Sequence, residues 1–332
     1  MEYITNKISK RGLSRIGFGG IPIQNEDISS ALKTLKECQK RGINYIDSAR
    51  GYKDSEKIIG EAIKGYRDHF FLATKSMAKT ESDMERDINI SLQNFQTDYI
   101  DLYQLHNPSR EGYKMCMEDG GAYHALLKAK KEGKIGHIGI TCHSLDLLEE
   151  VVESGKFESV MYPYNLVEVQ GEEFFKKCKE LGILTIAMKP LAGGALENRE
   201  LAIKYLLNKD VDIILIGMRD YNEVIFNTSI KKESLSEKDE KEVNKIRDSL
   251  GSDFCRRCGY CAPCTKGIDI PNCFVFEGYF KRYNLKEWAV ERYNSLKAHA
   301  SDCIECGKCL TRCPYHLNII EKLKEVRKTF GK

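Results

Sequence analysis

The chain has 332 residues, enough for one large domain and a smaller one. Its 52 lysine and arginine residues nearly balance its 49 aspartate and glutamate residues, which argues against a nucleic-acid-binding protein. Residues 1–11 hold no apolar signal stretch, and no apolar run approaches the roughly 18 residues of a membrane span. We therefore expect a cytoplasmic protein with no membrane partner.

Apolar, β-branched segments alternate with amphipathic segments over the first 230 residues. The predicted strands are 14–18, 43–47, 70–74, 99–105, 135–140, 159–161, 184–188 and 213–216. The predicted helices between and after them are 27–40, 56–64, 81–94, 122–131, 145–154, 172–180 and 200–207. Such alternation predicts parallel strands, and eight of them at this length favour a (β/α)8 barrel, an α/β fold. An open doubly wound sheet is the alternative, although no G-x-G-x-x-G follows the first strand.

Polar residues interrupt three consecutive apolar strands near their carboxyl ends, where barrel enzymes carry their chemistry. Asp47 ends the second strand, Lys75 the third and His106 the fourth, while Tyr52 follows in the loop after Asp47. A tyrosine can protonate a developing alkoxide if a nearby ammonium lowers its pKa. An aspartate would hold the lysine, and a histidine would donate a hydrogen bond to a carbonyl oxygen. This set of residues matches hydride addition to an aldehyde or ketone, or the reverse oxidation of an alcohol.

A charged helix predicted over 236–250 ends before Gly251, where we place the boundary between a barrel domain (1–250) and a small, mainly helical domain (251–332). The small domain carries two cysteine runs with spacings typical of two [4Fe-4S] clusters, as in two-cluster ferredoxins. The first cysteine run is Cys255, Cys258, Cys261 and Cys264, and the second is Cys303, Cys306, Cys309 and Cys313.

In two-cluster ferredoxins the fourth cysteine of a run binds the other cluster. The second run matches the bacterial pattern, including Pro314 after Cys313. The first run departs from it, because only two residues separate Cys261 from Cys264. Cys273 therefore remains a reserve ligand. Zinc is the alternative metal, but three successive short spacers supply more thiolates than a tetrahedral ion needs. Disulfides do not suit a reducing cytosol.

The strand-end segments Asn44–Tyr52, Leu72–Lys75 and Asp101–His106, together with Lys189–Gly194, resemble the aldo/keto reductase family. The cysteine runs resemble the ferredoxin-type extension of one branch of that family. The resemblance implies a barrel that binds NADPH or NADH across its carboxyl-end mouth, with Tyr52 as the acid/base. It also implies a set of cofactor contacts: Gly19, Thr141, Cys142, Asn165, Met188, Lys189, Pro190, Leu191, Gly193, Gly217, Arg219, Glu223 and Asn227.

Several of these positions depart from the family's pattern. Thr141 and Cys142 stand where many members have Ser-Asn, and Met188 where an aromatic residue often stacks on the nicotinamide. Glu223 stands where NADPH-preferring members often have arginine, and a carboxylate there suits a ribose hydroxyl better than a phosphate. Arg219 offers a compensating charge, so both dinucleotides remain open.

Three functions fit these observations. The first is a nicotinamide-dependent carbonyl reductase whose clusters stabilise a small domain that cannot otherwise build a core. The second is an electron-transfer oxidoreductase with a ferredoxin-like partner and a flavin or another mediator, since hydride moves two electrons whereas a cubane usually passes one. The third is a non-catalytic sensor of nicotinamide and cluster state, which would need no proton donor.

Overall fold

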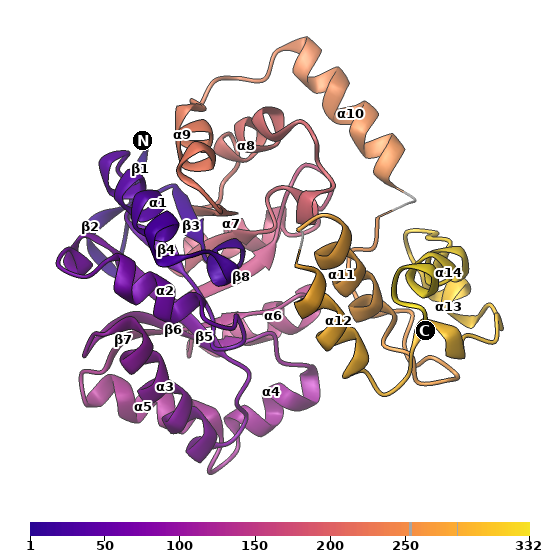
Figure 1. Ribbon diagram of the computed structural model, residues 1–332, viewed down its shortest axis with the longest axis horizontal. Helices are drawn as coiled ribbons and strands as arrows, with labels where there is room; N and C mark the ends of the chain where they lie inside the picture. Colours follow the sequence, from indigo (N-terminus) through magenta and orange to yellow (C-terminus); the bar gives the residue numbers. More distant parts are fainter. Residues whose placement is uncertain (252–253, 284) are drawn as a thin grey trace. The chain divides into compact units, whose positions relative to one another are not determined.

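A computed structural model describes residues 1–251, 254–283 and 285–332 (Figure 1). The chain forms two compact units by its internal contacts. The first comprises residues 1–164, 170–190 and 203–234, and the second comprises 165–169, 191–202 and 235–332. The predicted boundary at 250/251 divides the chain at a single point, whereas the second unit also includes two earlier segments. This boundary stays a prediction. None of the described helices is long and apolar enough to cross a membrane.

The first unit is built on a closed, eight-stranded parallel barrel, which confirms the predicted fold. The order around the barrel is β10-β3-β4-β5-β6-β7-β8-β9. The strands are β3 (Ile16–Gly19), β4 (Tyr45–Asp47), β5 (Phe71–Ser76), β6 (Ile100–His106), β7 (Ile135–Thr141), β8 (Ser159–Pro163), β9 (Leu184–Met188) and β10 (Ile213–Gly217). Their side chains are almost wholly buried because the barrel interior and the surrounding helices cover both faces.

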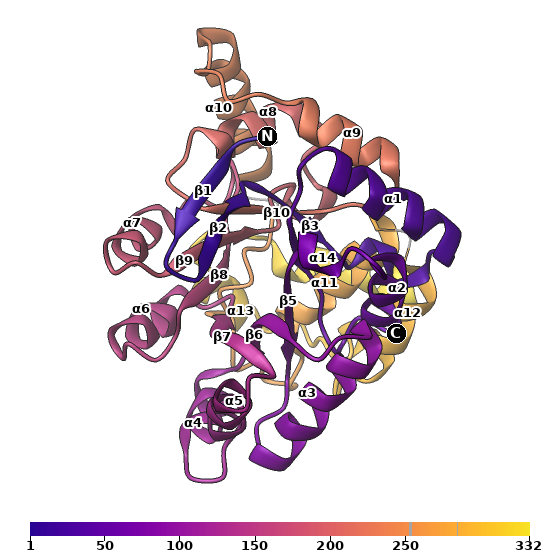
Figure 2. The ribbon, with the colours of Figure 1, turned by 90° about the vertical axis from the view of Figure 1, so that its left-hand side faces the viewer.

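Helices follow the strands and surround the barrel (Figure 2). They are α1 (Ile28–Lys40), α2 (Ser55–Ala62), α3 (Glu81–Phe95), α4 (Arg110–Met117), α5 (Ala122–Lys131), α6 (Leu145–Glu153), α7 (Glu172–Glu180), α8 (Arg199–Leu207) and α9 (Tyr221–Ser229). Several begin at a capping side chain; Asp27, for example, accepts the Ser30 N–H at 2.9 Å and so starts α1 one residue later than predicted.

Two features differ from the sequence prediction. The first predicted strand, 14–18, is divided between β2 (Ser9–Ser14) and the barrel strand β3, and β2 pairs with β1 (Tyr3–Asn6) in an antiparallel hairpin. Ile8 and Leu13 of this hairpin pack into the apolar cluster that fills the barrel, which explains why a short, largely polar segment folds there. Helix α4 was also not predicted; it lies in the connection after His106 and buries Cys116.

The second unit is mainly helical. Its helices are α10 (Glu237–Gly251), α11 (Ile270–Lys281), α12 (Lys286–Asn294), α13 (Lys308–Arg312) and α14 (Ile319–Phe330). Its apolar core includes Cys273, Tyr293, Leu323 and Val326, and Tyr293 stacks on Phe330 with ring centroids 4.2 Å apart. Cysteine side chains from both runs pack against this core, so the core and the cysteine sites are lined by some of the same side chains.

Candidate active site and cluster sites

A buried ion pair joins the ends of two neighbouring barrel strands. The Lys75 ammonium on β5 donates to the Asp47 carboxylate at the end of β4, and also to the Ser48 carbonyl oxygen at 2.6 Å. Asp47 and Lys75 are each 2% exposed. Burial raises the pKa of Asp47 and lowers the pKa of Lys75, while the attraction between the two groups opposes both shifts. The pair therefore depends on its hydrogen bonds to remain charged.

Gln104 completes this pair and was not predicted from the sequence. Its side-chain amide donates to the second oxygen of Asp47 at 3.0 Å, and Gln104 lies beside Lys75 in the β5–β6 register. The sequence could have indicated Gln104, because it precedes His106 by two positions and residues two apart share one face of a strand. Asp47 is thus held from both sides.

Tyr52 and His106 lie above the buried pair and are both partly exposed. Their rings meet edge to face, with centroids 5.8 Å apart and planes at 88°. The Lys75 nitrogen lies 5.0 Å from the centre of the Tyr52 ring. The structure thus brings the four predicted catalytic residues together, with the two rings accessible and the charged pair beneath them.

Tyr52 is carried by a loop that is fastened on both sides. The Arg50 guanidinium pairs with buried Glu56 at 2.6 Å, and the Arg50 N–H donates to the Lys75 carbonyl oxygen at 3.0 Å. Ser55 links the hydroxyl of Ser48 to the carbonyl of Gly20 through two contacts of 2.8 Å. These bonds hold the tyrosine over the lysine.

The side chains expected beside the nicotinamide make bonds within their own connections. The hydroxyl of Thr141 accepts the Asn107 N–H at 3.1 Å, which leaves its proton available as a donor. Cys142 is 1% exposed, and its thiol donates to the Pro108 carbonyl at 3.7 Å. Asn165 accepts two backbone N–H groups of its own loop at 2.9 Å. Thr141 therefore fits a cofactor contact better than Cys142 does.

The segment after β9 is a tight turn in which several residues adopt the left-handed region. Met188 ends the strand partly buried against the barrel core, and Pro190 is buried. Lys189, Gly193 and Gly194 have φ values of 57°, 66° and 80°, the left-handed region that glycine adopts without strain. Leu191 is partly buried and precedes the short 3₁₀ turn Ala192–Gly194. A Cβ at Gly193 would lie 3.8 Å from the Tyr283 hydroxyl, and one at Gly194 would lie 3.3 Å from the Arg282 side chain, so side chains of the same unit pack against this turn.

The remaining predicted dinucleotide contacts lie where β10 leads into α9. Gly19 pairs with Gly217, and a Cβ at Gly19 would lie 3.1 Å from the Ile216 carbonyl oxygen, so the strands require a small residue there. Glu223 accepts the backbone N–H of Arg219 at 2.7 Å. Asn227, one turn further along α9, is buried.

Charge at this end of β10 is mixed. Glu26 lies 3.6 Å from the Arg219 guanidinium. Burial raises the pKa of Glu26, and the nearby carboxylates of Asp27, Asp220 and Glu223 add to the increase, whereas Arg219 opposes it. Arg219 therefore stands among several acids.

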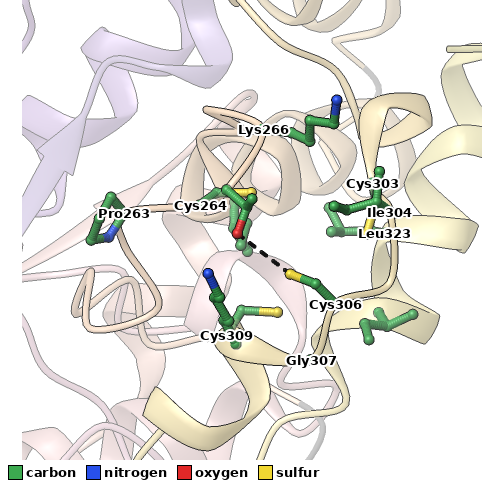
Figure 3. Close-up of a pocket in the computed structure, with 13 residues that line it drawn as sticks. Pro263, Cys264, Lys266, Cys303, Ile304, Cys306, Gly307, Cys309 and Leu323 are labelled. Carbon is green, nitrogen blue, oxygen red and sulfur yellow. Dashed lines mark hydrogen bonds between the residues drawn. The ribbon is translucent and has the colours of Figure 1, made fainter.

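The eight cysteines of the two runs line two separate pockets, four in each. The first cluster pocket is lined by Cys255, Cys258, Cys261 and Cys313. The second cluster pocket is lined by Cys264, Cys303, Cys306 and Cys309 (Figure 3). Each run thus places three cysteines in one pocket and its fourth in the other, the exchange typical of two-cluster ferredoxins. The surrounding Ile270, Leu317 and Leu323 are buried, so the thiols fit a cubane in an apolar setting.

Cys273 borders neither cluster pocket; it is fully buried in the core of the second unit. The geometry thus favours Cys264 over Cys273 as the fourth thiolate of its pocket. Among the described residues, no three His, Cys, Asp or Glu side chains are arranged to hold a single metal ion. A cubane does not need such convergence, because each thiolate binds a different iron.

Sequence comparison identifies two families. A sequence model of the aldo/keto reductase family matches residues 15–201, and one of a 4Fe-4S dicluster domain matches residues 254–318. The chain is 30% identical over 205 residues to YqkF, an uncharacterized oxidoreductase of Bacillus subtilis, covering 57% of this chain and 64% of the relative. It is 28% identical over 215 residues to the NADH-specific methylglyoxal reductase of Escherichia coli, covering 57% of this chain and 65% of that relative.

The chain therefore spans a little under two thirds of the length of these two relatives. The glyoxal reductase of Bacillus subtilis is matched over 88% of its length and 71% of this chain, at 28% identity. Among solved structures, the holo form of the aldo-keto reductase AKR11C1 from Bacillus halodurans has a TM-score of 0.65 at 24% identity, covering 74% of this chain and 96% of its own. An aldo-keto reductase from Klebsiella pneumoniae in complex with NADPH has a TM-score of 0.64 at 20% identity, with the same coverage of 74% and 96%.

Proposed function

Because the chain belongs to the aldo/keto reductase family and carries a 4Fe-4S dicluster domain, we propose that it is a nicotinamide-dependent reductase of aldehydes or ketones, able to run in reverse on alcohols. The observation that carries the proposal is the buried Asp47–Lys75 pair lying beneath the accessible ring of Tyr52. A cation placed next to a phenol has little purpose in a binding protein, but it is what a proton donor to an alkoxide requires.

The proposed roles follow from the geometry. The Lys75 ammonium favours the phenolate of Tyr52, so the phenol gives up its proton more readily as negative charge develops on a carbonyl oxygen. Asp47 keeps Lys75 charged and in place, and Gln104 keeps Asp47 in place. His106, at the edge of the Tyr52 ring, would orient the same oxygen by a hydrogen bond. The nicotinamide supplies the hydride when it is bound.

Two cofactors complete the proposal. Two [4Fe-4S] clusters would be held by the four thiolates of each cluster pocket. NADPH or NADH would lie along the carboxyl ends of the barrel strands, near Thr141 and the β10–α9 connection. Small reactive aldehydes are the substrate class to test first, since two relatives are named reductases of methylglyoxal and of glyoxal.

A second candidate function is electron exchange with a ferredoxin-like protein. It is favoured by the second cluster pocket, where Cys306 and Ile304 are exposed and a bound cluster would lie within reach of a partner. An iron, sulfide and flavin assay with a visible spectrum would weigh the two candidates. Bleaching of the cluster absorbance by reduced ferredoxin, with a bound flavin present, would favour the second.

Tyr52→Phe tests the first candidate. We expect a fall of about 10²–10⁴-fold in the rate of NADH or NADPH oxidation with methylglyoxal, the usual contribution of a general acid. Dinucleotide affinity, measured by fluorescence titration, should not change. Tyr66→Phe is the matched control, because the Tyr66 hydroxyl donates to the Ala62 carbonyl at the end of α2, at 2.6 Å. A Tyr52→Phe protein with full turnover on carbonyls would refute the catalytic assignment.

A further inference from the structure

A buried carboxylate that has no part in the proposed chemistry lies beside strand β5. Glu56, the second residue of α2, is 0% exposed. One of its oxygens accepts the hydroxyls of Thr74 and Ser91, each at 2.8 Å. The other accepts the guanidinium of Arg50 at 2.6 Å and the side-chain amide of Asn94 at 3.0 Å. Four donors fill the accepting capacity of an ionised carboxylate.

The four donors of Glu56 come from three different parts of the barrel unit. Thr74 is on β5, two others are on α3, and Arg50 is in the loop between β4 and α2. Thr74 directly precedes Lys75, and successive side chains of a strand point to opposite faces. Glu56 therefore bonds the face of β5 that lies opposite Lys75. One charged group thus joins α2 to a strand, a second helix and a loop.

Arg50 extends this connection to the turn that carries Tyr52. Its backbone N–H donates to the Lys75 carbonyl oxygen at 3.0 Å, so Arg50 is bonded to β5 through its main chain and to Glu56 through its side chain. Two residues further on, the Tyr52 N–H donates to the Ala49 carbonyl oxygen at 3.0 Å. The Arg50 side chain is only 22% exposed, so its pair with Glu56 is largely withdrawn from water. The position of the Tyr52 turn against β5 thus depends on Glu56.

We propose that Glu56 is a positioning residue for carbonyl reduction: through Arg50 and β5, it fixes the turn of Tyr52 over Lys75. The inference rests on the proposed function, in which the Tyr52 phenol gives a proton to the developing alkoxide. Because Glu56 is fully buried, it cannot itself touch a substrate. It acts on the spacing of the proton donor, whose ring centre lies 5.0 Å from the Lys75 nitrogen. A displacement of about 1 Å in such a site can cost about 100-fold in rate.

Glu56 also acts on the charge of Lys75. Burial lowers the pKa of Lys75, and the carboxylates of Asp47 and Glu56 oppose that effect. The titratable and charged side chains on the elements packed against this part of β5 are Asp47 (β4), Arg50 and Tyr52 (the β4–α2 loop), Glu56 (α2), Asp87 (α3) and His106 (β6). Removing the charge of Glu56 therefore lowers the pKa of Lys75 further, and the ammonium is lost at a lower pH.

Glu56→Gln tests the positioning in the cluster-loaded, full-length protein. The kcat for methylglyoxal reduction should fall at least tenfold, while the dissociation constants of NADH and NADPH, measured by fluorescence titration, should stay at their wild-type values. The decline of kcat at high pH should begin at a lower pH than in the wild type, because Lys75 loses its proton earlier. Glu61→Gln is the matched control and should behave as the wild type, since Glu61 lies on the same helix and accepts the Gln96 amide at 2.6 Å.

Glu56→Asp separates position from charge. Aspartate keeps the negative charge, but its carboxylate is one methylene shorter and cannot reach all four donors. We expect kcat to fall while the decline at high pH stays where it is in the wild type.

Crystal structures of the variants provide a readout that does not rely on turnover. In Glu56→Gln the ring of Tyr52 should move away from the Lys75 nitrogen, while the barrel strands keep their positions. If Glu56→Gln does not fold, Glu56→Asp takes its place, because it keeps the buried charge opposite Arg50; its kcat should fall and its Tyr52 ring should be displaced.

Two results would overturn the inference. One is a wild-type kcat in folded Glu56→Gln or Glu56→Asp. The other is a reduced kcat with the Tyr52 ring in place and an unshifted pH profile, which would make Glu56 a contributor to stability alone. A wild-type protein that oxidises neither NADH nor NADPH with any aldehyde would instead refute the proposed function. In that case a displaced Tyr52 ring in Glu56→Gln would still show that Glu56 sets the turn.

Discussion

The side-chain amide of Gln104 donates a 3.0 Å hydrogen bond to the carboxylate oxygen of Asp47 that Lys75 leaves available. All three side chains are buried, so no water competes for these bonds. Lys75, which we propose polarises Tyr52, is thus held by Asp47, and Asp47 is held by Gln104. Tyr52 is partly exposed and is the residue that we expect to meet a substrate.

Gln104→Leu should lower kcat/KM for carbonyl reduction by about 10-fold or more, because a hydrogen bond to a charged group contributes about 1.5–3 kcal/mol. The loss should appear in kcat, since the proposed role of Asp47 and Lys75 is in proton transfer rather than in dinucleotide binding. Steady-state kinetics and fluorescence titration of NADH and NADPH separate the two. Gln93→Leu, at an exposed position of α3, is the control and should match the wild type. Unchanged kcat in Gln104→Leu would show that Asp47 needs no support.

The assignment of cluster ligands makes a prediction about Cys264 and Cys273. Cys264→Ala should reduce iron from about eight to about four atoms per chain, since one cubane loses a ligand. Cys273→Ala should keep about eight, because Cys273 serves only as a small apolar group in the core of the second unit. Iron and sulfide analysis of anaerobically purified protein measures both. The opposite pattern, with iron lost from Cys273→Ala, would transfer the ligand role to Cys273.

The exchange of fourth ligands can be tested separately with double variants. Cys264 and Cys303 line one pocket, so Cys264→Ala/Cys303→Ala should lose no more iron than either single variant. Cys255 lines the other pocket, so Cys264→Ala/Cys255→Ala should lose both clusters. Additive loss in the first pair would mean that each run fills its own pocket.

Glu223→Gln should improve affinity for NADPH relative to NADH. Glu223 lies beside the Arg219 backbone in the connection where a 2′-phosphate would bind, and its charge would repel that phosphate. Removing one such repulsion at about 4 Å in a solvated site is worth about 1 kcal/mol, or roughly fivefold. Glutamine keeps an oxygen to accept the Arg219 N–H. Dissociation constants for both dinucleotides measure the effect, with Glu173→Gln on α7 as a control. Equal changes for NADH and NADPH would place the phosphate elsewhere.

Much of the molecule could be predicted from local pattern. Apolar strand segments and amphipathic helix segments alternate because the barrel strands are buried on both faces and the surrounding helices on one, and that alternation predicted the barrel. Asp47, Lys75 and His106 stood out because they end strands that are otherwise apolar. The hairpin of β1 and β2 was missed because Ile8 and Leu13 become a recognisable apolar pair only when they meet the barrel interior. Helix α4 was missed because it buries only Gly112 and Cys116, too few positions to show an apolar helical repeat.

By itself, the sequence determined the barrel, the strand-end residues and the presence of two cysteine runs, because spacing along one strand or one turn carries that information. Only the tertiary structure decided which thiols share a pocket, that Gln104 supports Asp47, and that buried Glu56 meets Asn94 across 38 positions of chain. These pairings join segments far apart in sequence, and a buried charge finds its partner only when the fold has removed both from water.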